Sequence, residues 1–135
     1  MSFQKTITIP GKPIPLARPR FSCRSTYDLQ TQLKNDVSFI IKSQISQPPT
    51  SKLVSLKIHF FMPIPKNLPP KKTELLECTP HRKRPDLDNL VKFYIDVCNG
   101  LIYNDDSQIF SITAAKFYSK EPRTVMFIAI GDDNA

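Results

Sequence analysis

The sequence contains very little glycine, and this shortage excludes one large class of nucleotide-binding site. Only three glycines, Gly11, Gly100 and Gly131, are spread over 135 residues. A loop that cradles phosphate groups with its backbone needs several glycines close together. The sequence therefore contains no phosphate-binding loop of that kind.

Cysteine is also scarce, with Cys23, Cys78 and Cys98 as its only three copies. Their spacing lacks the paired pattern of a zinc site, so we expect free thiols, with Cys98 in the core. There is no long apolar run either, which argues against a membrane span and a secretory signal. A cytoplasmic location is the default expectation.

Positive charge and proline are abundant. The chain has 19 lysines and arginines, 12 aspartates and glutamates, and 13 prolines, giving a formal net charge of +7. A basic protein suits a polyanionic partner such as nucleic acid, although many soluble proteins are basic too. The length and the 40% hydrophobic content suit one globular domain over residues 1–135.

Hydrophobic periodicity predicts four strands and two main helices. Alternation predicts strands at residues 3–9 and 53–62, and a strand-like run predicts a third at 109–118. A nearly continuous apolar run at 125–130 predicts a fourth strand that is covered on both faces. The last two form an expected hairpin. Helical spacing predicts helices from Asp28 to before Pro48, and from Asp86 or Asp88 to Gly100. The order β-α-β-α-β-β predicts a small α+β domain with a mixed sheet packed against two helices.

Carboxylates, an amide and a lysine crowd the start of the second helix, in the stretch 84–92. Asp88 and Lys92 are four residues apart and share a polar face. Helix capping and a solvent-exposed ion pair would explain this pattern without any catalytic role. A second acidic pair, Asp105 and Asp106, follows the helix and must be brought back by packing if it is to join the first. A calcium loop does not fit, because apolar residues and a lysine stand where further acidic ligands are needed.

Residues 84–109, RPDLDNLVKFYIDVCNGLIYNDDSQI, resemble the core signature of the RusA family of Holliday-junction resolvases. Residues 11–15 and 17–21 are similar to the opening of many such proteins. The resemblance implies that Asp86, Asp88 and Asp106 are catalytic carboxylates that bind metal and that Lys92 assists. Asp105 and Asn89 also match the pattern, with less definite roles.

The chemistry of phosphodiester hydrolysis gives an independent reason for these residue types. The reaction needs an activated water and a clamp for the charge that grows on the phosphate, and hard cations supply both. Magnesium prefers oxygen ligands, so we expect aspartates to hold Mg²⁺, with Mn²⁺ as a substitute. Lys92 would act as a positioned charge.

Basic residues surround the motif in the sequence. We expect residues 63–84 to form a mobile basic loop that grips phosphates, with a solvated connector as the alternative. His81 is a possible auxiliary residue, and residues 131–135 form a polar tail. The candidate DNA-binding residues are Arg18, Arg20, Arg24, Lys71, Lys72, Arg82, Lys83 and Arg84.

The resemblance implies a RusA-like homodimer that resolves four-way DNA junctions by paired, metal-dependent hydrolysis in recombination and repair. A two-fold dimer would present two identical sites to a junction of similar symmetry. Two alternatives stay open. One is a related nuclease that acts on flaps, forks or other phage replication intermediates. The other is a noncatalytic protein that binds branched DNA.

Overall fold

The computed structural model describes residues 3–17 and 24–131, with no account of the side chains of residues 24–29. Four strands and two long helices alternate as the sequence predicts, so the α+β fold class is confirmed. In chain order the elements are β1 (Phe3–Pro10), α1 (Arg24–Gln44), β2 (Val54–Pro63), α2 (Pro70–Leu76), α3 (Leu87–Cys98), the short 3-10 helix η1 (Asp106–Gln108), β3 (Ile109–Ser119) and β4 (Arg123–Ile130).

The strands form one mixed sheet in the order β1-β4-β2-β3. β4 pairs antiparallel with β1 and with β2, whereas β2 and β3 run parallel. The expected hairpin of the last two strands is therefore wrong, because β2 lies between β3 and β4. A proline turn marks a reversal of the chain, but it does not fix which strand becomes the hydrogen-bonded neighbour.

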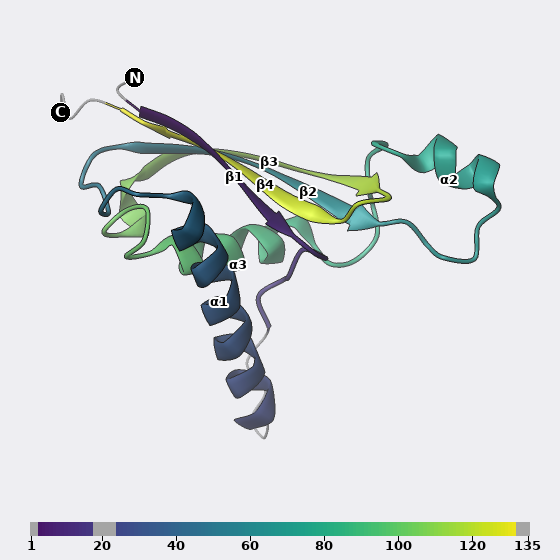
Figure 1. Cartoon of the computed structure of the whole chain (residues 1–135), viewed down its shortest axis with the longest axis horizontal. Helices are drawn as coiled ribbons and strands as arrows, with labels where there is room; N and C mark the ends of the chain where they lie inside the picture. The colour runs from purple at the N-terminus through teal and green to yellow at the C-terminus, as the bar shows by residue number, and fades with distance from the viewer. Residues whose placement is uncertain (1–2, 18–23, 132–135) are drawn as a thin grey trace.

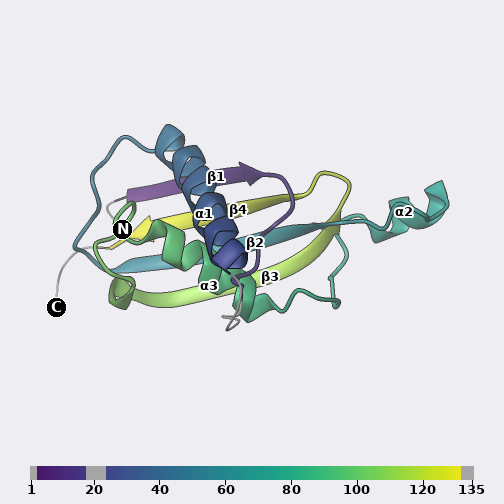
Figure 2. The same ribbon diagram turned by 90° about the horizontal axis from the view of Figure 1, so that it is seen from below.

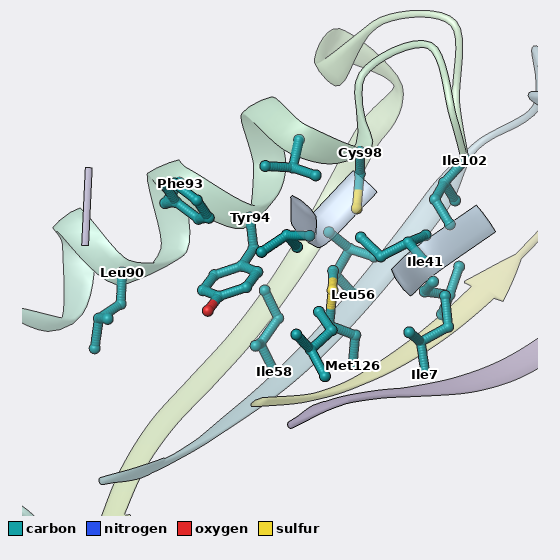
Figure 3. Packing of buried hydrophobic residues seen from close by; sticks show 14 of the residues in the cluster. Ile7, Ile41, Leu56, Ile58, Leu90, Phe93, Tyr94, Cys98, Ile102 and Met126 are labelled. Atoms are coloured by element: carbon teal, nitrogen blue, oxygen red, sulfur yellow. The ribbon is translucent and has the colours of Figure 1, made fainter. Parts of the chain in front are cut away.

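Both long helices pack on the same face of the sheet, as Figure 1 shows. The apolar stripe of α3 meets the inward side chains of β2 and β4. Figure 3 shows Leu90, Tyr94 and Cys98 directed toward the layer that contains Ile58 and Met126. Spacings of three and four residues put these α3 side chains on one stripe, and strand alternation puts the sheet residues on one face.

None of the described helices covers the opposite face of the sheet (Figure 1). This corrects the prediction that residues 125–130 form a strand covered on both sides. Met126 and Ile128 are buried beneath the helices, while Phe127, between them, is 37% exposed. Burial under a helix therefore does not explain why the outward residue Phe127 is apolar.

The helix boundaries agree with the sequence at α3 and differ at α1. α3 begins after Asp86 and ends at Asn99, and Gly100 takes the positive φ of 78° that favours glycine at a helix end. α1 begins at Arg24, four residues before the expected Asp28, because nothing in Arg24–Tyr27 breaks a helix. None of the described helices combines the length and apolarity that crossing a membrane requires.

The segment 63–84 carries more structure than expected. It contains the short helix α2, which projects beyond one end of the sheet in Figures 1 and 2. Its returning part lies along the edge of β3, where the amide of Cys78 donates to the carbonyl of Tyr118 at 2.8 Å. The amide of His81 donates to the carbonyl of Lys116 at 3.0 Å, so the chain is tied to the sheet shortly before it reaches α3.

Candidate active site

Asp86 stands at the N-cap of α3, but its side chain accepts no capping hydrogen bond. Its backbone carbonyl starts the helix by accepting from the amide of Leu90 at 3.2 Å. Asp88 lies in the first turn and is exposed. The positive end of the helix dipole favours carboxylates at this position. Two acidic side chains are thus presented at one helix end, and that of Asp86 is not engaged in capping.

Lys92 lies one turn further along, with its Nζ 4.0 Å from a carboxylate oxygen of Asp88. Both side chains are exposed, so this ion pair contributes little to stability. Asn89, the remaining polar residue of the motif, accepts the amide of Leu16 with its backbone carbonyl at 2.9 Å. The N-terminal segment therefore lies against the first turn of α3.

Lys116, which is not among the residues predicted from the sequence, supports the chain immediately before Asp86. Its Nζ donates to the carbonyl of Lys83 at 2.7 Å and to that of Pro85 at 2.8 Å. A charged donor makes strong hydrogen bonds to carbonyl groups. Strand alternation could have pointed to this role. It places Lys116 on the same side of β3 as Ala114 and Tyr118, which face the helices, and a lysine on that side needs hydrogen-bond partners.

His81 lies beside this support. Its ring packs edge-on against Tyr118, with centroids 4.7 Å apart, and its Nδ1 is buried without a hydrogen-bond partner among the described residues. Burial, with the charges of Lys116 and Lys83, lowers the pKa of His81. The imidazole is therefore neutral at pH 7 and is placed near the chain that leads into Asp86.

The second acidic pair lies past the other end of α3. Asp105 caps η1 by accepting from the amide of Ser107 at 3.1 Å, while the Gln108 side chain accepts from the amide of Asp105 at 2.9 Å. The hydrogen bonds from Ser107 lower the pKa of Asp105. Gln108 also donates to the carbonyl of Thr50 at 2.8 Å, which fixes η1 against the segment that leads into β2.

The structure of one chain does not bring Asp106 together with Asp86 and Asp88. α3 has 12 residues, so its two ends are roughly 17 Å apart at the helical rise. Asp106 begins η1, which follows the end of α3 and is held at Thr50 by the side chain of Gln108. Among the described residues no group of three or more histidine, cysteine or acidic side chains can hold a metal ion.

The candidate DNA-binding residues are distributed over three regions. Arg82, Lys83 and Arg84 are exposed and lead directly into Asp86. Lys71 and Lys72 are exposed on α2, at the projecting end of the molecule (Figure 2). Arg18 and Arg20 lie outside the described residues, and Arg24 begins α1 without a described side chain.

A family model described as Endodeoxyribonuclease RusA matches residues 10–129, nearly the whole chain. The chain belongs to the RusA endodeoxyribonuclease family. It is also 33% identical over 131 residues to a Bacillus subtilis (strain 168) protein named Uncharacterized protein YqaN, an alignment that covers 90% of this chain and 92% of that protein. The RusA match includes α3, Asp106 and Lys116, so family membership extends over every part of the candidate site.

Proposed function

We propose that this RusA-family protein is a divalent-metal-dependent endonuclease that resolves four-way DNA junctions by paired incisions. The observation that carries the proposal is the family match over residues 10–129. The exposed acidic start of α3 supports it, because a polyanionic substrate is repelled by carboxylates unless a cation lies between them. A noncatalytic DNA-binding protein would gain nothing from Asp86 and Asp88 at that position.

Each metal site is proposed to be shared by two copies of the chain. One protomer offers Asp86 and Asp88 at one end of α3 and Asp106 beyond the other end. A two-fold axis that crosses α3 pairs two antiparallel copies of the helix, so the start of one lies beside the end of the other. Asp86 and Asp88 then meet Asp106 of the partner subunit, and the dimer contains two such sites.

Exposed apolar side chains on the edge strand support an interface of this kind. Phe110 and Ile112 lie just after Asp106 at the start of β3, and they are 64% and 43% exposed. The segment that returns from α2 pairs with β3 only near its end, at residues 116–118, and no described strand lies beside Phe110 and Ile112 on the outer edge. A second copy that covers Phe110 and Ile112 would bury apolar surface. This contact would lie next to Asp106, the residue proposed to complete the metal site of that second copy.

Three carboxylates are a suitable oxygen set for Mg²⁺ or Mn²⁺. Such an ion would activate a water molecule and neutralise charge on the scissile phosphate. Lys92 lies within the same surface and would add a fixed positive charge toward the phosphate. Arg82, Lys83 and Arg84 would hold the DNA backbone on the approach to Asp86, with Lys71 and Lys72 further out.

The test is cleavage of a labelled four-way junction, a flap and a plain duplex with Mg²⁺, with Mn²⁺ and with chelator. Asp86→Asn is compared with wild type, and Asp36→Asn, an exposed change on α1, serves as the matched control. We expect symmetric nicks in the junction that vanish in chelator and in Asp86→Asn, while junction binding is retained. Preferred cutting of the flap would support the alternative nuclease, and cutting that persists in chelator would refute the metal requirement.

A further inference from the structure

The uncovered face of the sheet carries aromatic and basic side chains at its centre. The strand register aligns three rows of outward residues across the sheet. In the order β1-β4-β2-β3 these rows are Thr6-Phe127-Lys57-Thr113, Thr8-Val125-His59-Ala115 and Pro10-Arg123-Phe61-Phe117. Four rings therefore occupy adjacent positions on a surface that faces away from both long helices (Figure 1).

The rings form one connected group with His59 at its centre. The His59 ring lies edge-on to Phe117 and to Phe127, with centroids 5.4 Å apart in both pairs. Phe61 and Phe117 have centroids 5.8 Å apart. Cross-strand aromatic pairs stabilise a sheet, which accounts for the half-buried rings of His59, Phe61 and Phe117 but does not require an exposed ring at Phe127. The exposed ring of Phe127 offers a flat surface for a planar group, whereas the Arg123 guanidinium covers the ring of Phe61.

Two cations lie on the same rings. Nζ of Lys57 is 5.5 Å from the centre of the Phe127 ring, and the Arg123 guanidinium is 3.9 Å from that of Phe61. Burial and the charge of Lys57 lower the pKa of His59, so this residue is neutral at pH 7. The face thus combines neutral rings with two permanent positive charges.

No outward residue in these three rows is acidic. At the end of the face, the carboxylate of Glu77 accepts from the Ser119 hydroxyl at 2.9 Å and the Lys120 amide at 2.7 Å, Glu74 pairs with Lys120, and Glu121 lies in the turn before Arg123. The surface is therefore complementary to a polyanion. A second copy of the same face would oppose Lys57 and Arg123 with identical charges, which disfavours self-association through this surface.

A shallow hollow of about 440 Å³ adjoins the rings, lined by residues of β1, β2 and β4 that include Gln4, Thr6, Ser55, Lys57 and Phe127. It provides polar groups and a lysine beside an exposed ring. Aromatic platforms flanked by cations are the surfaces on which unpaired bases stack while the backbone follows positive charge. Duplex DNA keeps its bases stacked inside and makes less use of such rings.

We propose that this open face of the sheet binds an unpaired DNA strand, with a base stacked on the exposed ring of Phe127 and phosphates near Lys57 and Arg123. The surface is separate from the start of α3, which lies in the helix layer on the other side of the sheet. It gives the protein a second DNA contact beyond the proposed cleavage site, one suited to the strand that is displaced when a branched substrate opens.

The test is fluorescence anisotropy with labelled oligothymidylate and with a matched duplex, in chelator so that nothing is cut. Phe127→Ala removes the exposed ring without touching the core. Phe39→Ala is the matched control, because Phe39 is 75% exposed on α1, away from the open face. Circular dichroism and light scattering verify that each variant is folded and has the oligomeric state of wild type.

We expect oligothymidylate to bind wild type and the control equally, and Phe127→Ala to weaken binding about 5- to 100-fold, as for loss of stacking. Lys57→Gln should weaken binding and flatten its salt dependence. Equal binding by Phe127→Ala, or no binding by wild type, would overturn the proposal. Weaker binding that coincides with loss of a dimer would overturn it in favour of an interface between copies. Because cleavage is not scored, these outcomes are independent of the proposed nuclease activity.

Discussion

The ammonium group of Lys116 lies 2.8 Å from the carbonyl oxygen of Pro85, the residue that precedes Asp86. The same group binds the carbonyl of Lys83 at 2.7 Å. A strand residue in the sheet thus fixes the chain that presents the first carboxylate of the motif. This link couples the position of Asp86 to the sheet rather than leaving it to a surface loop.

Removing that link should reduce activity more than stability. Lys116→Met keeps the length of the side chain but loses both hydrogen bonds, so residues 83–85 are no longer held. We expect metal-dependent junction cleavage to fall on the order of 10- to 100-fold, as for groups that orient metal ligands. The measurement is kcat/KM, with exposed Lys42→Gln as control. An unchanged kcat/KM in Lys116→Met would mean that other contacts position Asp86.

Replacing Lys92 tests whether this residue acts in catalysis or only in the ion pair with Asp88. Both side chains are exposed at a 4.0 Å separation, so Lys92→Ala should change the free energy of unfolding by less than about 0.5 kcal/mol. Cleavage should nevertheless fall steeply if Lys92 faces the phosphate. Urea denaturation and single-turnover cleavage are measured on the same preparation. Equal cleavage by wild type and Lys92→Ala would show that Lys92 has no role in the reaction.

The two histidines predict how stability depends on pH. The pKa values of His59 and His81 are both lowered from 6.5 in the fold. The unfolded chain then binds more protons than the folded chain as the pH falls through 6.5, so the free energy of unfolding decreases. We expect a lower denaturation midpoint at about pH 5.5 than at about pH 7.5. His59→Gln and His81→Gln should each flatten this slope, and a slope that neither change alters would contradict the assignment.

The elements that the sequence predicted well are those with strong local patterns. The stripe of α3, the stop at Gly100 and the alternation of β2 depend on neighbouring residues, so they are readable without the fold. Strand adjacency is not local, and the insertion of β2 between β3 and β4 could not be predicted from a turn. The prediction that the strand at residues 125–130 is covered on both faces was wrong for a related reason. An apolar run does not show which face of a sheet is left open, so the outward position of Phe127 could not be predicted.

At the candidate site the sequence located the acidic motif but not its support. Asp86 and Asp88 were found because their spacing and the helix start are visible in the sequence. Lys116 lies far along the chain from Asp86 and binds backbone carbonyls. Every residue has a backbone carbonyl, so the sequence does not show which residues Lys116 binds. The length of α3 already predicted that Asp106 starts far from Asp86, but only the folded chain shows that packing within one copy does not bring them together.

The shared metal site is tested most directly by mixing two inactive variants, Asp86→Asn and Asp106→Asn. In a mixed dimer with shared sites, one site has both substitutions and the other has none, so junction nicking should return to a fraction of wild type. If each site lay within a single chain, both sites of the mixed dimer would remain broken. We predict that nicking is restored on mixing and subunit exchange. Continued inactivity, with mixed dimers verified by mass spectrometry, would contradict the shared site.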